Sequence, residues 1–231
     1  MEIKMWEVGG HVRDSLLGIE SKDIDIAVEA PSWEVMREFV QKNTQKIFLE
    51  KPEFLTIRAM GFDGLPKDFV LCRKDGDYSD GRRPDSVEPG TILDDLQRRD
   101  FTVNAIARNV ETGEIFDPFD GVKDIKSMYL RCVGDTKERF DEDALRILRA
   151  IRFHITKGFL LSDDISRVLC DSYYWPSKLA AISVERIREE MLKCFRHSTP
   201  VTLRFLGDIH PQMVSAIFGD DMWLKPTMEE R

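Results

Sequence analysis

Hydrophobic and polar residues alternate along residues 23–28, and this pattern predicts a β-strand with one apolar and one polar face. The isoleucine and valine side chains of the strand would point to one side, whereas Asp23, Asp25 and Ala27 would point to the other. Two carboxylates held on the same side repel each other unless a cation lies between them. The pattern therefore predicts a divalent metal ion as the partner of this strand.

The residues before this strand, Val8–Asp14, predict a strand that ends in a glycine turn and continues as a short helix. The turn at Gly9 and Gly10 leaves backbone N–H groups free to hold anionic oxygens. Arg13, about one turn into the helix, could add a bidentate contact to a phosphate. Carboxylates that bind metal beside a phosphate site indicate phosphoryl or nucleotidyl transfer, although each motif alone is also common in plain loops and turns.

Further apolar runs and one helical pattern follow in the first third of the chain. The helix is expected to have Ser32 as its N-cap and to run through Val40. Strands are expected at Ile47–Leu49, Phe54–Ile57 and Phe69–Cys72. Several strands with few helices between them predict a small mixed sheet with helices on one side.

The pattern becomes helical from Thr136 onward, with Thr136 or Asp135 as the first cap. A long helix is expected over Glu142–Phe153, in which Asp143 and Arg146 are neighbours on one face. Two more arginines continue at the same spacing of three. On spacing alone, an ion-paired amphipathic helix is the favoured interpretation of this stretch.

Two more helical stretches complete the chain. Ile182–Lys193 has a serine cap, with acids and bases at helical spacing. Pro200–Phe218 follows, with Leu203, Leu206 and Ile209 as the expected packing positions.

Composition narrows the class of protein. With 231 residues, 42% of them hydrophobic and 33% charged, the chain can bury a core and form one globular domain or two small ones. No apolar run approaches a membrane span, and the N-terminus lacks the apolar core of a signal peptide. The four cysteines form no Cys-x-x-Cys pair, which predicts free thiols in a reducing compartment, the cytoplasm, and argues against a disulfide frame or a zinc site.

The net charge of −8 argues against indiscriminate binding of nucleic acid, because such binding depends on a broad positive potential. Any contact to RNA is therefore expected from a local basic surface. Its affinity should be modest and sensitive to salt.

The first two motifs, read together, resemble a known family. Val-Gly-Gly-x-Val-Arg-Asp-x-Leu-Leu-Gly begins at Val8, and Lys-Asp-x-Asp begins at Lys22. The joined string resembles the opening motif of class II tRNA nucleotidyltransferases and bacterial poly(A) polymerases, which belong to the polymerase-beta-like nucleotidyltransferases. Later strings are similar to further motifs of the family and occur in its order: Arg-Arg-Asp-x-x-x-Asn-Ala from Arg98, Ile-Phe-Asp-Pro-Phe-Asp-Gly from Ile115, and Glu-Asp-x-x-Arg from Glu142.

The resemblance runs from Val8 to about Phe218 and implies an α+β fold. A nucleotidyltransferase head, with a small mixed sheet flanked by helices, is expected over residues 1–135, and an all-helical neck that reads the base over residues 136–231. The family's helical body and tail domains have no counterpart, so the resemblance implies a short form with head and neck only. Asp120 stands where the third motif usually has glycine.

The resemblance also implies roles for individual residues. Asp23 and Asp25 would hold two Mg²⁺ ions, and Asp68 on the neighbouring strand could be a third acid. Asp143 and Arg146 would read the base, because Arg only donates hydrogen bonds and Asp only accepts them. The residues implied to bind the nucleotide are Gly9, Gly10, Arg13, Arg99, Asp100, Asn104, Asp143, Arg146, Arg149 and Arg152.

A polar segment over residues 75–85 predicts a mobile loop, because it is rich in glycine and charge and has no period. Asp80, Gly81, Arg82 and Arg83 in this segment resemble the family's flexible loop. That loop is implicated in the switch from CTP to ATP incorporation, so its presence favours addition of A.

The function that the resemblance implies is template-independent addition of C and/or A, from CTP and ATP, to the 3′ end of tRNA by two-metal catalysis. A poly(A) polymerase is the nearest alternative, although Lys46–Leu49 lacks the Gly-Arg-Arg-Phe-like string of that branch. A catalytically silent protein that binds nucleotide or RNA is the alternative of another class. No membrane partner is expected, and a homodimer could supply the surface that the missing domains provide elsewhere.

Overall fold

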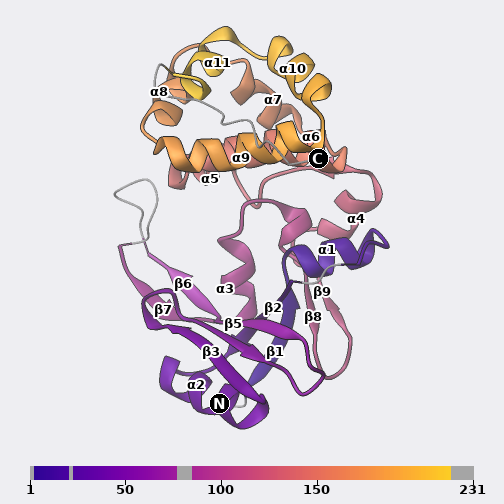
Figure 1. Cartoon of the computed structure of the whole chain (residues 1–231), viewed down its shortest axis with the longest axis vertical. Coiled ribbons are helices and arrows are strands. Elements are labelled where there is room, and N and C mark those ends of the chain that lie inside the picture. The colour runs from indigo at the N-terminus through magenta and orange to yellow at the C-terminus, as the bar shows by residue number, and fades with distance from the viewer. Residues whose placement is uncertain (1–2, 21–22, 77–84, 220–231) are drawn as a thin grey trace, which may run out of the picture. The chain divides into compact units, whose positions relative to one another are not determined.

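The computed structural model describes residues 3–20, 23–76 and 85–219. The chain divides into two compact units, of which the first ends at Ser127 and the second begins at Met128 (Figure 1). The division of work expected around residue 135, with catalysis before it and base recognition after it, stays a prediction. The predicted loop residues Asp80, Gly81, Arg82 and Arg83 lie outside the described residues.

The first unit is built on a mixed sheet, as the sequence predicts. The sheet has seven strands in the order β3-β4-β5-β2-β1-β8-β9. Only β2 and β5 pair in parallel, and the other five pairs are antiparallel. A separate hairpin consists of β6 (Arg73–Asp75) and β7 (Val87–Pro89). The strands of the large sheet are β1 (Lys4–Val8), β2 (Ile24–Glu29), β3 (Lys46–Lys51), β4 (Thr56–Met60), β5 (Pro66–Leu71), β8 (Ala107–Asn109) and β9 (Ile115–Phe116).

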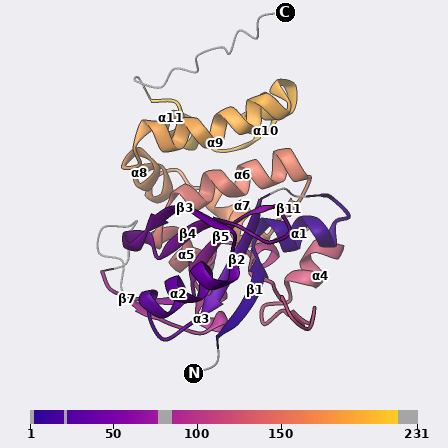
Figure 2. The ribbon, with the colours of Figure 1, turned by 60° about the horizontal axis from the view of Figure 1, so that its bottom comes forward.

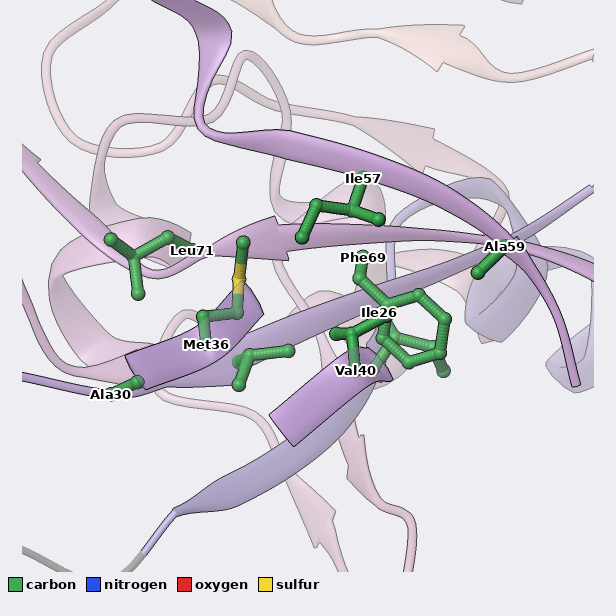
Figure 3. Packing of buried hydrophobic residues seen from close by; sticks show 9 residues of the cluster. Ile26, Ala30, Met36, Val40, Ile57, Ala59, Phe69 and Leu71 are labelled. Atoms are coloured by element: carbon green, nitrogen blue, oxygen red, sulfur yellow. The ribbon is translucent and has the colours of Figure 1, made fainter. Parts of the chain in front are cut away.

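Helix α2 (Trp33–Asn43) covers one face of this sheet, and the helix and the strands enclose a hydrophobic core between them. Met36 and Val40 of the helix pack on Ile26, Val28 and Phe69 of the strands (Figure 3). The alternation expected in β2 is confirmed, because its isoleucine and valine side chains all belong to or pack on this cluster. The serine cap of α2 is also confirmed, since the Ser32 hydroxyl accepts a hydrogen bond from the Val35 N–H at 3.4 Å.

One expected strand begins two residues later than its apolar run suggests. Pro52–Phe54 forms a short 3₁₀ helix, and Leu55 has a φ of 52°, so that β4 begins at Thr56. The expectation of a strand from Phe54 is therefore wrong. Proline is well suited to a first helical position, where its missing N–H costs nothing, and this favours the turn over an extended start.

The remaining helices of the first unit are short and lie between or beside the strands. Asp120 has a φ of 60° at the start of the last of them, which explains why glycine suits this position in the family motif. The Asp117 carboxylate accepts hydrogen bonds from the Gly121 and Val122 N–H groups at 2.7 and 2.9 Å. These helices are α1 (Gly10–Leu16), α3 (Ile92–Gln97), the 3₁₀ helix η2 (Thr102–Asn104) and α4 (Gly121–Lys126).

The second unit is helical apart from a pair of two-residue strands, β10 (Tyr129–Leu130) and β11 (Leu160–Leu161). Its long central helix, α6, packs along α9 (Figure 2). No helix in the described part of the chain is long and apolar enough to cross a membrane. The helices are α5 (Thr136–Glu142), α6 (Leu145–Lys157), α7 (Asp163–Leu169), α8 (Tyr174–Ala180), α9 (Val184–His197), α10 (Thr199–Asp208) and α11 (Pro211–Ile217).

Three expectations for the second unit need correction. The helix expected over Glu142–Phe153 is broken, because Asp143 has an extended backbone (φ −154°, ψ 102°) and α6 begins only at Leu145. Ser183 precedes α9, but within the described residues its side chain accepts no capping hydrogen bond. Leu203 is 58% exposed, whereas the other two expected packing positions, Leu206 and Ile209, are buried.

The cap expected at the start of α5 is Asp135. Its carboxylate accepts a hydrogen bond from the Glu138 N–H at 2.9 Å.

The four cysteines are free thiols, as expected. Cys72, Cys132 and Cys194 are buried, and Cys170 is exposed. Burial raises the pKa of Cys194 to about 12. The buried thiol is therefore protonated at neutral pH and chemically quiet.

Candidate active site

Two carboxylates meet on adjacent strands of the large sheet. The parallel register of β2 and β5 places Asp25 beside Asp68, with the strands about 4.8 Å apart. Both residues lie on the face opposite the α2 core, because the residues that alternate with them belong to that core. Burial raises the pKa of Asp25 above its ordinary value, Arg99 opposes the rise, and the carboxylates of Asp68 and Asp23 add to it. The site thus accumulates negative charge that a cation would relieve.

The donor set suits a hard divalent ion, because Asp23, Asp25 and Asp68 offer the carboxylate oxygens that Mg²⁺ prefers. Across the described residues, no three His, Cys, Asp or Glu side chains are already grouped as metal ligands. Asp68 already has a cationic partner, because the Arg58 Nε lies 3.1 Å from Asp68 Oδ1. A metal ion here would therefore compete with Arg58 for this carboxylate.

The glycine turn brings a guanidinium close to Asp25. Gly9 has a φ of 69°, a conformation that side chains other than glycine rarely adopt. A Cβ atom at Gly9 would lie 3.0 Å from Arg99 Nη1 and 3.6 Å from Asp25 Oδ2. Glycine at this position therefore permits both the turn and the close approach of a cation and an anion. Gly10 begins α1, as expected.

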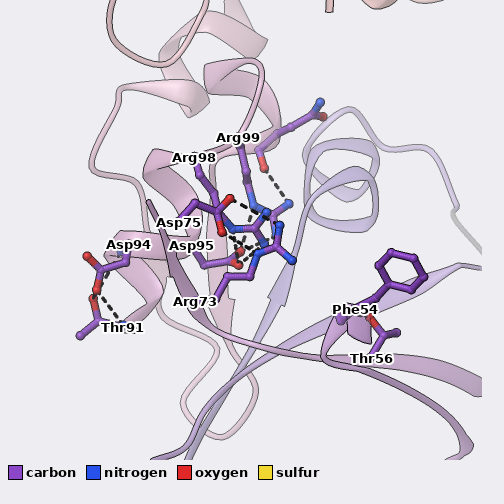
Figure 4. A network of polar contacts seen from close by, with 10 residues as sticks. Phe54, Thr56, Arg73, Asp75, Thr91, Asp94, Asp95, Arg98 and Arg99 are labelled. Atoms are coloured by element: carbon purple, nitrogen blue, oxygen red, sulfur yellow. Dashed lines mark hydrogen bonds and ion pairs between the residues drawn. The ribbon is translucent and has the colours of Figure 1, made fainter. Parts of the chain in front are cut away.

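Arg99 is held in place by Asp95, a residue to which the motifs assign no role. Asp95 is only 1% exposed and accepts hydrogen bonds from Arg98 Nη2 at 2.5 Å and from Arg99 Nη2 at 2.9 Å (Figure 4). Although burial opposes ionisation, Arg99 and Arg98 hold the pKa of Asp95 below its ordinary value. Arg99 also donates to the Asn104 carbonyl at 3.3 Å. The spacing of three and four residues between the acid and its two arginines is the sequence signal that could have revealed this clamp.

Arg13 lies in an internal network. It is 7% exposed, and its Nη1 donates to Asn104 Oδ1 at 2.6 Å while its Nε donates to Asp14 Oδ1 at 2.9 Å. Asn104 in turn donates to Asp100 Oδ1 at 3.0 Å. Arg13 thus ties α1 to the segment that carries Asp100 and Asn104, and its expected contact to phosphate stays a prediction.

The pair expected to read the base is arranged differently from the expectation. Asp143 accepts from the Leu145 N–H at 3.0 Å and from Arg186 Nη2 at 2.6 Å. Arg146 donates to Glu142 Oε2 at 2.5 Å. Asp143 therefore does not share a face of α6 with Arg146, because it lies in the break between α5 and α6.

The two later arginines of α6 lie in the same unit. Arg149 is partly buried, and Arg152 Nε lies 2.5 Å from Glu190 Oε2 on α9. Glu190 is 4% exposed, and although burial opposes ionisation, Arg152 holds its pKa below the ordinary value. The implied contacts of both arginines with the nucleotide stay predictions. Glu190 was not expected from the sequence.

Residues 5–131 match the model of the family described as the Poly A polymerase head domain. The CCA-adding enzyme of Anoxybacillus flavithermus is 43% identical over 187 residues, which cover 80% of this chain and 45% of that protein. The CCA-adding enzyme of Geobacillus kaustophilus is 42% identical over 187 residues, with 80% of this chain and 44% of that protein covered. The chain thus spans somewhat less than half the length of these relatives.

Solved structures agree in fold. The CCA-adding enzyme of Bacillus stearothermophilus in complex with CTP has a TM-score of 0.74 at 34% identity, over 90% of this chain and 48% of that one. The Thermotoga maritima CCA-adding enzyme complexed with tRNA has a TM-score of 0.71 at 27% identity, over 96% of this chain and 50% of that one. The resemblance of the motifs is thereby confirmed, and the chain belongs to the family of the poly A polymerase head domain.

Proposed function

We propose that this protein is a template-independent nucleotidyltransferase that adds C and/or A, from CTP and ATP, to the 3′ end of tRNA. The observation that carries the proposal is the pairing of Asp25 with Asp68, beside Arg99 and the Gly9 turn. Acids next to a guanidinium and a tight glycine turn suit a metal-bound triphosphate. The names of the relatives, CCA-adding enzymes, support the choice of substrate.

The first unit supplies the groups for the chemical step. Asp25, with Asp23 and Asp68, would hold Mg²⁺ through carboxylate oxygens. Bound Mg²⁺ supplies two effects, a lower pKa for the acceptor hydroxyl and stabilisation of the charge that develops on pyrophosphate. Arg99, fixed by Asp95, would donate to the triphosphate that lies over the Gly9 turn.

Asp100 would position the sugar, with Asn104 beside it. Their side chains already form a hydrogen bond of 3.0 Å, and Asn104 is held from the other side by Arg13. A group that is fixed before the substrate arrives loses little freedom on binding. Arg13 therefore contributes to the proposed site by orienting Asn104.

Base selection is assigned to the second unit. Asp143 accepts and Arg146 donates, so together they can match one edge of C or A. Each is oriented by an ionic partner, Asp143 by Arg186 and Arg146 by Glu142. Arg149 and Arg152 would line the same nucleotide site.

The proposal is tested by extension of tRNA transcripts that end before the CCA sequence, after its two cytidines, or after full CCA. Each transcript is incubated with the protein, Mg²⁺ and either one nucleotide or CTP plus ATP. The proposal expects C and/or A on the incomplete ends and nothing further on the full CCA end. A folded protein that extends no tRNA would contradict it.

Poly(A) synthesis is the second candidate, and the name of the matched family favours testing it. The assay separates the two activities when an unrelated RNA is included. Long adenosine tracts on any RNA would identify poly(A) synthesis. Binding of nucleotide without turnover in isothermal titration would identify a silent binding protein.

A further inference from the structure

The face of the sheet that carries Asp25 and Asp68 continues outward across two more strands. In the register, Asp68 lies beside Arg58 on β4, and Arg58 lies beside Leu49 on β3. Paired residues of adjacent strands point to the same face. A single row thus runs from Asp25 to Leu49, and each step is about 4.8 Å.

Two lysines flank the outer end of this row. Lys46 pairs with Met60, and Lys51 pairs with Thr56, so both lysines share the face of Arg58. All three cations are exposed. The one acid of β3, Glu50, pairs with Ile57 and points to the opposite face, where Arg37 Nε lies 2.7 Å from its carboxylate. We call Lys46, Leu49, Lys51 and Arg58 the basic sheet face.

Exposed aromatic rings accompany the lysines. Phe48 and Phe54 are 48% and 50% exposed. The Lys46 ammonium lies 5.9 Å from the centroid of the Phe48 ring, and the Lys51 ammonium lies 6.0 Å from that of Phe54. Cations interleaved with exposed rings are the combination that binds single-stranded nucleic acid, through phosphate contacts and base stacking.

We propose that the basic sheet face binds the phosphate backbone of the RNA acceptor strand, just upstream of the 3′ end that the Asp25–Asp68 pair extends. The identity of the ligand, an RNA acceptor strand, rests on the proposed function. The chain carries a net charge of −8, so a polyanion needs a local positive surface. This face is such a surface, and its row of paired residues ends at the carboxylates that we assign to metal binding. Arg58 lies nearest to them and is paired with Asp68, so the two lysines carry the positive charge that contacts phosphates farther upstream.

The test is the double variant Lys46→Gln/Lys51→Gln, which leaves Arg58 and all carboxylates unchanged. Binding of a labelled tRNA transcript that ends after two cytidines is measured by fluorescence anisotropy at several salt concentrations. We expect binding about tenfold weaker at low salt, and a slope of log affinity against log salt that is shallower by about 1.4 for two lost single-strand contacts. The matched control is Lys42→Gln on α2, an exposed lysine away from this face.

Each outcome decides the inference. Unchanged affinity and slope in the double variant, or no binding by the wild-type chain at low salt, would overturn it. A change in self-association by sedimentation, with RNA binding intact, would overturn it in favour of contact between two copies at the β3 edge. Wild-type binding with the expected loss, but without extension of the transcript, would leave this face assigned and refute the proposed function.

Discussion

The two units hold their candidate site residues in different ways. In the first unit, alternation along β2 places Asp25 on the polar face, and the strand register then brings Asp68 beside it. In the second unit, Asp143 lies in the break before α6 and Arg146 lies within that helix. Each has an ionic partner of its own, Arg186 for Asp143 and Glu142 for Arg146. Strand pairing thus fixes the spacing of the carboxylates in the first unit through the backbone, whereas in the second unit the orientation of each side chain depends on its ionic partner.

The largest expected effect concerns the first unit. Asp25→Asn removes a carboxylate that we assign to metal binding, which is worth several kcal/mol in the transition state, so nucleotide incorporation should fall at least about 1000-fold. The variant should still fold, because the substitution also removes a half-buried negative charge that the Asp68 and Asp23 carboxylates repel. Single-turnover kinetics and thermal unfolding measure the two effects. Asp63→Asn in an exposed turn is the control, and near wild-type turnover by folded Asp25→Asn would refute the metal assignment.

Asp95→Asn should destabilise the first unit. Removing one partner of a buried ionic cluster costs about 3–5 kcal/mol, and partial exposure of the two arginines lowers our expectation to about 2–3 kcal/mol. Urea unfolding measures the free energy. The variant should also raise the KM for the nucleotide, because Arg99 loses its anchor. Arg98→Gln, which leaves the Arg99 contact in place, should leave that KM nearly unchanged, and equal effects of the two variants would remove Asp95 from the positioning role.

Arg186→Gln tests whether the ionic partner of Asp143 matters in the second unit. Arg186 donates a hydrogen bond to Asp143 and would orient it for base reading. Loss of this bond between charged groups should reduce discrimination against UTP and GTP about tenfold. Incorporation rates with each of the four nucleotides measure it. Arg167→Gln, in an exposed pair on α7, is the control. Unchanged discrimination would exclude Arg186, and with it this orientation of Asp143, from base selection.

The smallest expected effect is on the pH dependence of stability. Because the pKa of Asp25 in the folded state is raised above 3.8, the folded state holds a proton that the unfolded state has lost, over the window just above that value. Stability from this group is therefore present at lower pH and lost as pH rises through the folded pKa. Asp25→Asn should remove this decline in a urea titration against pH, and an identical pH profile would contradict the raised pKa.

Much of the first unit could be predicted from the sequence, because turns, caps and alternation are local. Ser32 caps α2, and the mixed sheet forms as expected. The bond between Arg13 and Asn104 could not be predicted, since the two residues are 91 positions apart and meet only through tertiary packing. The ion pairs of Asp95 could have been predicted, because Arg98 and Arg99 follow it at helical spacing.

In the second unit, residue spacing predicts less, because local side-chain hydrogen bonds and contacts between helices also decide where side chains lie. The spacing of Asp143 and Arg146 predicts one helix face, but the short Asp143 side chain accepts a local hydrogen bond from the Leu145 N–H, and this bond competes with a continuous helix. Glu190 pairs with Arg152 from another helix, at a distance in sequence that no local pattern encodes. Leu203 fits an apolar spacing, yet its exposure is set by what the neighbouring helices cover.

We propose that Asp25 and Asp68 on adjacent strands together bind the metal for nucleotide transfer to tRNA. The most direct measurement is extension of a tRNA transcript that lacks CCA, with CTP, ATP and Mg²⁺, by the wild-type chain and by Asp68→Asn. We expect addition of C and/or A by the wild type, and a folded Asp68→Asn variant whose rate is lower by at least about 100-fold. A folded Asp68→Asn variant with wild-type turnover would contradict it.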